Sequence, residues 1–271
     1  DENSIRREVK FAMARDPKKF IERNVREAAK HFQERPEVIT EFGEPVIRYV
    51  SAFHPLFDHL YMERLCEHPK KIYNPGHSII VHYVPVIGDA VEDLEAKGRD
   101  SHKWERAHYD SIMLSQYINM AIRDSLAKLG RISSISGVAT DWNRKMHMPM
   151  WGGKIVACMA GIGELGPAGS FHSEYGYAGS IGTTMTDGFY ADASPEMTAE
   201  ELDAEIQKIK EAFCYEGLAE VKADAEMISV CPGKAIGTDG IDRAKCLAYC
   251  ESQNKKIPDP GLCGMCFRFK R

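Results

Sequence analysis

Apolar residues recur along this chain in two alternating patterns, one helical and one strand-like. Helical spacing runs over residues 4–33, with Pro17 placed at a first helical position inside that stretch. Further helices are predicted at 54–66 and, much longer, at 101–129. The long helix is expected to bury a stripe made of Ile112, Leu114, Tyr117, Ile118, Ala121, Ile122 and Leu126.

The strand-like pattern is strongest over residues 77–85, a run rich in β-branched side chains that follows a Pro-Gly turn. A capping box at Thr198 opens a further helix that runs to about Phe213. Residues 150–166 begin as a helix and end in a glycine-rich stretch. Shorter strands are predicted at 132–138 and 180–185, and residues 44–50 suit either a short strand or a turn. This order of elements predicts an α+β or mixed α/β fold.

Charge and hydropathy narrow the function classes. Lys and Arg number 35 against 40 Asp and Glu, for a formal net charge of −5, which argues against a general phosphate-binding surface. A nucleic-acid partner is therefore not expected. No apolar run reaches the ~18–20 residues that span a bilayer, and no signal-peptide pattern opens the chain. We expect a cytoplasmic protein without a membrane span, although a start at Asp1 is compatible with a removed leader.

The cysteines gather in the tail. Six of the eight lie after residue 213, which favours a metal over structural bridges. Four of them suit the thiolate ligands of one [4Fe–4S] cluster: Cys231, Cys246, Cys263 and Cys266. Gly264 would let the backbone approach the cluster, and Cys250 competes with Cys246 for one ligand position. Structural zinc and disulfides are the alternatives, although zinc typically uses paired Cys-x-x-Cys knuckles and only one is present. Cys66 and Cys158 stand in apolar surroundings typical of buried structural thiols.

Three blocks of sequence resemble the corrinoid- and iron–sulfur-dependent reductases, a family that includes epoxyqueuosine reductases and reductive dehalogenases. The blocks are 160–166 with 175–176 and 180–187, 231–236 with 241–246 and Tyr249, and 263–266. The resemblance covers roughly residues 75–271 and implies a nitroreductase-like α/β core at 75–213 with a C-terminal ferredoxin-like iron–sulfur module at 214–271. Residues 1–74 lie outside it as an N-terminal helical segment.

Family members usually carry a second cluster, whose ligand positions are occupied here by Val221, Asp224, Met227 and Lys270. All four ligands of that cluster are missing together, so the resemblance implies a variant that retains one cluster, the one nearer the corrinoid. The family's Asp-x-His-x-x-Gly signature for cobalt begins at Asp100 and His102 but has Glu105 in place of its glycine. The lower cobalt face is therefore not expected to be held by that His.

The resemblance also implies where a corrinoid would be bound. The expected contacts are Gly161, Gly163, Gly166, Ser180, Gly182, Thr183, Thr186 and Pro232. Read from the residues alone, the same stretch is a helix C-cap followed by a strand with ordinary threonine propensity. FMN in the core is the alternative cofactor.

Reduction at a corrinoid needs a proton donor. No Asp stands beside Pro149, and His147 is the nearest titratable group, with Tyr109 and Tyr117 as rivals. Lys154, together with Arg144 and Lys145, is a candidate to hold an anionic group of the substrate, and simple solvation of these side chains is the alternative.

These residues predict a corrinoid-dependent, oxygen-sensitive reductase of a small organic substrate, similar to reductive dehalogenases. A ferredoxin or flavodoxin would supply its electrons, and a homodimer is compatible with the N-terminal helices. The alternatives are a non-catalytic corrinoid-binding or corrinoid-reducing electron-transfer protein and a flavin-dependent reductase.

Overall fold

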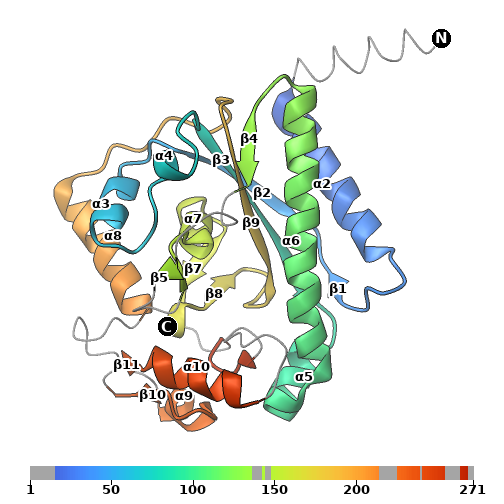
Figure 1. The fold of residues 1–271 in the computed structure, drawn as a ribbon, viewed down its shortest axis with the longest axis vertical. Coiled ribbons are helices and arrows are strands. Elements are labelled where there is room, and N and C mark those ends of the chain that lie inside the picture. The colour runs from blue at the N-terminus through green and yellow to red at the C-terminus, as the bar shows by residue number, and fades with distance from the viewer. Residues whose placement is uncertain are drawn as a thin grey trace.

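The computed structural model describes residues 16–135, 142–143, 148–213, 225–238, 240–253 and 263–267. Its centre is a five-stranded antiparallel sheet (Figure 1). The strands of this sheet are β1 (Glu41–Phe42), β2 (Val46–Ser51), β3 (Ser78–Ile87), β4 (Ser133–Ile135) and β9 (Gly179–Thr186). Strand β3 pairs with β1, β2 and β9, and β4 pairs with the far side of β9.

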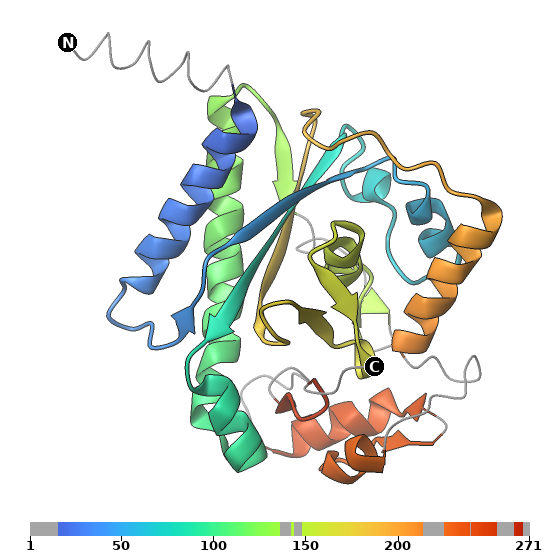
Figure 2. The ribbon, with the colours of Figure 1, turned by 180° about the vertical axis from the view of Figure 1, so that it is seen from behind.

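Helices lie on both faces of the sheet and at one end of the molecule (Figures 1 and 2). They are α2 (Pro17–Gln33), α3 (Leu56–Met62), α4 (Pro69–Ile72), α5 (Ala90–Lys97), α6 (His102–Lys128), α7 (Gly153–Met159), α8 (Ala199–Ala212), α9 (Ala225–Val230) and α10 (Arg243–Ser252), with 3-10 turns η1 (Gly98–Asp100) and η2 (Pro167–Gly169). Three hairpins complete the described chain: β5 (Trp142–Asn143) with β6 (Met148–Pro149), β7 (Gly163–Leu165) with β8 (Phe171–Ser173), and β10 (Ile236–Gly237) with β11 (Gly240–Ile241).

Strand β3 is apolar on both sides because both of its faces are covered. Its Ile80 and Val84 pack with α2 and α6, whereas Ile79 and Val81 pack with α3, α7 and α8. Figures 1 and 2 show α2 and α6 side by side along one side of the sheet, with α9 and α10 at one end of the molecule. None of the described helices is both long and apolar enough to cross a membrane.

The coarse prediction of mixed helix and sheet is confirmed, and every described strand pair is antiparallel, as in an α+β fold. The nitroreductase-like and ferredoxin-like assignments and the domain boundaries stay predictions. Within the segment expected to be helical, 1–74, residues 41–42 and 46–51 supply two strands of the sheet.

Local signals placed several elements correctly. Helix α2 begins at Pro17 behind an Asp16 N-cap, and α8 begins with the capping box at Thr198. The predicted stripe on α6 is buried at Leu114, Ile118, Ile122 and Leu126. It is wrong for Ile112, which is 43% exposed, because α6 packs on the sheet and on α2 through a narrower face. Residues 4–15 and 136–138 of the predicted helix and strand lie outside the described residues.

Candidate active site

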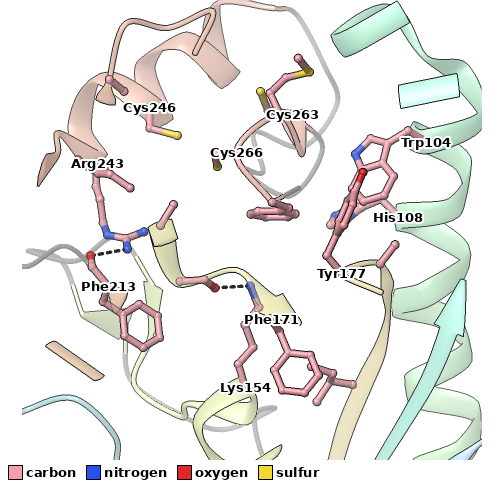
Figure 3. A pocket seen from close by; sticks show the side chains of 18 of the residues that line it. Trp104, His108, Lys154, Phe171, Tyr177, Phe213, Arg243, Cys246, Cys263 and Cys266 are labelled. Carbon is pink, nitrogen blue, oxygen red and sulfur yellow. Dashed lines mark hydrogen bonds between the residues drawn. The ribbon is translucent and has the colours of Figure 1, made fainter. Parts of the chain in front are cut away.

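One cavity of about 680 Å³ lies between the sheet and the cysteine-containing tail. Its walls come from the ends of β3 and β9, the first half of α6, the start of α7, η2, and residues from 231 onward. Figure 3 shows the cysteines on one side of this space and Lys154 and Phe171 on the opposite side. Segments that are far apart in sequence therefore border a single cavity.

All four cysteines predicted as metal ligands line this cavity: Cys231, Cys246, Cys263 and Cys266. We call them the thiol wall. Cys231 directly follows α9, Cys246 lies on α10, and Cys263 and Cys266 flank a turn. Cys250 is buried on α10 and is not among the lining residues, so the wall contains Cys246 rather than its competitor.

The thiols of this wall lie close enough to influence one another electrostatically. A hydrogen bond with Cys250, then burial, raises the pKa of Cys246, and the charges of Cys266 and Cys263 add to the effect. Burial raises the pKa of Cys263. Burial and then Cys263 raise the pKa of Cys266 to about 12. Thiols in this state become thiolates when a metal supplies positive charge, because a coordinating thiol is deprotonated outright.

The donor set fits an iron–sulfur cluster. The backbone N–H of Ala235 donates to Cys231 Sγ at 3.3 Å, the kind of contact that tunes cluster sulfurs. Gly264 has a φ of +63°, and a Cβ on it would lie 2.6 Å from the Trp104 indole. Among the described residues, no three His, Cys, Asp or Glu side chains could hold a single metal ion together. A cube binds each thiolate to a different iron, so its ligands are spread more widely than those of one ion.

The remaining cavity wall is aromatic and cationic. Trp104, His108 and Tyr177 stand together on one side of the space, and Arg243 and Phe213 stand on the other (Figure 3). Lys154 Nζ donates to the Gly169 carbonyl at 2.8 Å, and Arg243 Nη2 donates to the Phe213 carbonyl at 2.9 Å. These hydrogen bonds hold two positive charges at the edge of the cavity.

Sequence reasoning missed His108, Tyr177 and Arg243 as cavity residues. The spacing of Trp104, His108 and Ser111 was an available signal, because positions i, i+4 and i+7 share one helix face, and all three line the cavity. Arg243 lies in a block that carries the family resemblance, but its place at the cavity depends on how the tail folds back on the core, and no local signal marks Tyr177.

The hydroxyls predicted to bind a corrinoid make hydrogen bonds within the protein. Ser180 Oγ donates to the Ser111 carbonyl at 2.6 Å, and Thr186 Oγ1 donates to the Ile132 carbonyl at 3.0 Å. Thr183 Oγ1 accepts from Trp151 Nε1 at 2.9 Å. None of these three side chains lines the cavity. Strand β9 pairs with β3 along its whole length and with β4 at residues 184–186, and its Ser and Thr side chains are buried, so these hydroxyls must find partners inside the protein.

The predicted glycines also lie away from the cavity, and of the expected cofactor contacts only Pro232 borders it. Gly161 has a φ of +67° and ends α7, where its N–H bonds the Cys158 carbonyl and the next N–H bonds the Ala157 carbonyl. This is the helix C-cap that the residues alone suggested. A Cβ on Gly163 or Gly166 would meet His172, and one on Gly182 would meet the ring of His82.

The predicted catalytic residues separate in space. Lys154 lines the cavity, whereas Tyr109 is half-buried beside His108 and does not. Tyr117 packs against Phe32 in the core between α2 and α6. His147, Arg144, Lys145 and Cys214 lie outside the described residues.

Two further thiols behave as structural cysteines. Cys66 is fully buried, its sulfur accepts the Gly152 N–H at 3.3 Å, and burial raises its pKa to about 12. Cys158 is half-buried on α7, and burial likewise raises its pKa to about 12. Thiols held protonated in this way are poor nucleophiles.

No protein-family model matches the chain, and no curated protein matches it. Among solved structures, the chain is similar to an epoxyqueuosine reductase from Streptococcus thermophilus, at 16% identity and a TM-score of 0.47, over 87% of this chain and 58% of that one. It is also similar to an epoxyqueuosine reductase with a tRNA-Tyr epoxyqueuosine-modified stem loop, at 14% identity and a TM-score of 0.43, over 86% of this chain and 58% of that one. A structure of the enzyme from Bacillus subtilis aligns at 15% identity with a TM-score of 0.38, over 86% of this chain and 58% of that one. The chain thus spans less than two thirds of the length of these proteins.

Proposed function

We propose that this chain is an iron–sulfur reductase in which the thiol wall holds one [4Fe–4S] cluster that exchanges single electrons with a redox cofactor in the adjoining cavity. The observation that carries the proposal is the shared cavity. All four thiols and the aromatic side chains of the core border the same space of about 680 Å³. A ligand in that space would lie directly beside the cluster.

The cavity suits a ligand with a flat ring system. Its volume falls within the ~300–1,000 Å³ of small-molecule sites, and Trp104, Phe171 and Tyr177 offer aromatic surfaces. By resemblance the ligand is a corrinoid, with FMN as the alternative, and either one supplies electron-accepting chemistry when bound. The hydroxyls and glycines first expected to bind it do not line the cavity, and the proposal therefore assigns the contacts to the residues that do, Pro232 among them.

The chain's own residues have distinct tasks in this arrangement. His108 borders the cavity and is the proposed proton donor, whereas the Tyr177 hydroxyl donates to Glu95 Oε1 at 3.2 Å, so Tyr177 offers the cavity its ring. Lys154 and Arg243, fixed by their bonds to backbone carbonyls, favour the negative charge that builds up on reduction. The aromatic walls exclude water from the space between the cluster and the ligand.

Anaerobic reconstitution with iron and sulfide tests the cluster. The wild-type chain is expected to bind four irons and to give a paramagnetic reduced state by electron paramagnetic resonance. Serine at any one position of the thiol wall is expected to lose most of this iron, whereas Cys158→Ser, a matched control outside the wall, keeps it. Stoichiometric zinc without iron would overturn the proposal.

The visible spectrum of anaerobically purified protein tests the cofactor. A corrinoid and a flavin give different bands, and each shifts on reduction. If the spectrum shows only the cluster after reconstitution with cobalamin and with FMN, the protein binds neither cofactor. The alternative of an electron-transfer protein would then be favoured. Reduction by ferredoxin or flavodoxin then identifies the class of electron donor.

The substrate is proposed to be a small organic molecule. A tRNA stem loop is bound in one of the similar structures, so the expectation that nucleic acid is not a partner needs its own test. Gel-shift titration with a tRNA stem loop at low salt should show no complex. A complex that weakens steeply with added salt would contradict this expectation.

A further inference from the structure

The turn that carries Cys263 and Cys266 lies against the side chain of Trp104 (Figure 3). Trp104 belongs to the first half of α6, whereas the turn lies near the end of the chain. A Cβ on Gly264 would lie 2.6 Å from Cε2 and Nε1 of the indole and 2.7 Å from Cζ2. The backbone therefore touches the ring at the residue that directly follows Cys263, and this approach requires a residue without a side chain.

The residues after Gly264 also pack on the core. Met265 and Phe267 pack against an apolar cluster formed by Val86, Ala90, Leu94, Trp104, Ala107 and Ala178. A Cβ on Gly98 would lie 3.4 Å from Met265 Sδ, and Lys154 Nζ lies 4.9 Å from the centre of the Phe267 ring. Contacts from η1, α6 and α7 therefore hold the turn on the core.

We infer that Trp104 is a positioning residue for the cluster: its indole docks the turn that carries Cys263 and Cys266 and shields this side of the cluster from water. The inference rests on the proposed function, because it needs a cluster on these cysteines. Trp104 is 6% exposed and lines the cavity together with both cysteines. Its ring thus occupies space that water would otherwise fill beside the cluster.

The physical reason is the charge that reduction adds. An electron that enters the cluster makes its sulfurs more negative, and water that reaches them stabilises this charge. Solvent exposure is accordingly one of the factors that set the reduction potential of such clusters. A cluster shielded by the indole should therefore have a lower reduction potential than the same cluster with water admitted.

Two substitutions at residue 104 separate the flat ring from its apolar bulk. Trp104→Leu stays apolar but lacks Cε2, Nε1 and Cζ2, the atoms that approach Gly264. After anaerobic reconstitution of the full chain with iron and sulfide, this variant should bind four irons but release them to a chelator about tenfold faster than wild type. Its midpoint potential should rise by up to about 59 mV, a tenfold change for a one-electron couple. Trp104→Phe keeps a flat ring and should stay close to wild type in both measurements.

Trp151→Leu is the matched control. Trp151 is also 6% exposed and lines the same cavity, but it stacks on Phe57 and donates to Thr183. Its loss should leave the rate of iron release and the midpoint potential at wild-type values.

A double-substitution cycle tests the contact itself. Gly264→Ala alone is expected to lose most of the iron, because the new Cβ collides with the indole. In the Trp104→Leu background the same change should leave the iron content close to that of Trp104→Leu, because the colliding atoms are gone. Equal losses in both backgrounds would show that Trp104 does not carry the contact.

The remaining outcomes also decide the question. An unchanged midpoint potential in folded, fully loaded Trp104→Leu overturns this inference alone. Equal potential shifts in Trp104→Leu and Trp151→Leu overturn it too, because the effect would then belong to the cavity in general. Failure of the wild type to bind four irons overturns the proposed function together with the inference. If Trp104→Leu does not fold, Trp104→Met, which is also apolar and without a ring, replaces it.

Discussion

Strand β9 and the cavity wall both present polar side chains, yet the two regions use them differently. On β9, Ser180 and Thr186 donate to backbone carbonyls, and Thr184 donates to Asn119 Oδ1 at 3.0 Å. At the cavity wall, the four thiols and His108 border an open space of about 680 Å³. The polar groups of β9 form hydrogen bonds within the protein. Those of the cavity wall border a space that a ligand can enter.

The difference follows from burial. The Ser and Thr side chains of β9 are almost fully buried, so an unbonded hydroxyl there would cost about 1–3 kcal/mol. The cavity wall is built by segments that approach one another without filling the space between them. Residue type alone therefore does not distinguish a ligand-binding polar group from a structural one.

The largest predicted effect concerns the cavity wall and is expected for the substitution Gly264→Ala. Its φ of +63° costs an L-residue about 1–2 kcal/mol, and the new Cβ would lie 2.6 Å from Trp104. We expect the turn that carries Cys263 and Cys266 to shift, and the iron content after reconstitution to fall to a small fraction of the wild-type value.

Gly161→Ala is the matched control for that variant. Gly161 has almost the same φ, +67°, but a Cβ there meets nothing within 4 Å. It should cost about 1 kcal/mol of unfolding free energy through the backbone alone and keep all the iron. Equal iron loss in both variants would show that backbone strain, not the contact with Trp104, is responsible.

The next largest effect concerns the pH dependence of the unfolding free energy, which we expect to depend on His82 in the central sheet. His82 is fully buried, and neither of its ring nitrogens has a hydrogen-bond partner among the described residues. Burial lowers its pKa from 6.5 to about 3. The unfolded chain therefore binds a proton that the folded chain does not between pH 6.5 and about 3. The free energy of unfolding should fall by about 1.4 kcal/mol per pH unit as pH drops through this window.

Urea unfolding at several pH values measures this slope. The variant His82→Gln cannot titrate and should remove it. His102→Gln, whose parent side chain is 93% exposed, should leave it unchanged. A slope that survives in His82→Gln would assign the acid sensitivity to other groups.

A smaller effect sharpens the assignment of the β9 hydroxyls. Thr183→Val leaves the buried Trp151 N–H without its acceptor and should cost about 1–3 kcal/mol of unfolding free energy. Iron content and cofactor content should stay at wild-type values, because Thr183 does not line the cavity. If a folded Thr183→Val protein lost its cofactor, the result would show that the Thr183 hydroxyl contributes to cofactor binding.

The smallest effect is expected at Tyr109. Tyr109→Phe should leave cofactor retention unchanged, because the side chain lies off the cavity. His108 is the neighbouring residue on α6, and it does line the cavity. His108→Phe removes this polar group and should weaken cofactor retention by up to about tenfold. Retention after gel filtration, read from the visible spectrum, measures both. The reverse ranking would place the ligand on the other face of α6.

Several elements were predictable because their signals are local. The Asp16 cap with Pro17, the capping box at Thr198 and the β-branched run of β3 each depend on a few neighbouring residues. The four cysteines of the thiol wall were also named from spacing and resemblance, and the fold brings all four to one cavity. The helix α10 that carries Cys246 was missed, since its apolar pattern is weak.

The sequence by itself determined the mixed helix and sheet composition and a tail with four thiols suited to a cluster, because periodicity, caps and cysteine spacing are written in short stretches of chain. Only the tertiary structure decided what the thiols face. Gly264 meets Trp104, and Cys266 shares a cavity with Lys154, across more than a hundred residues of sequence. The same packing turned the hydroxyls of β9 inward, because a buried polar group must be satisfied by whatever neighbour the fold supplies.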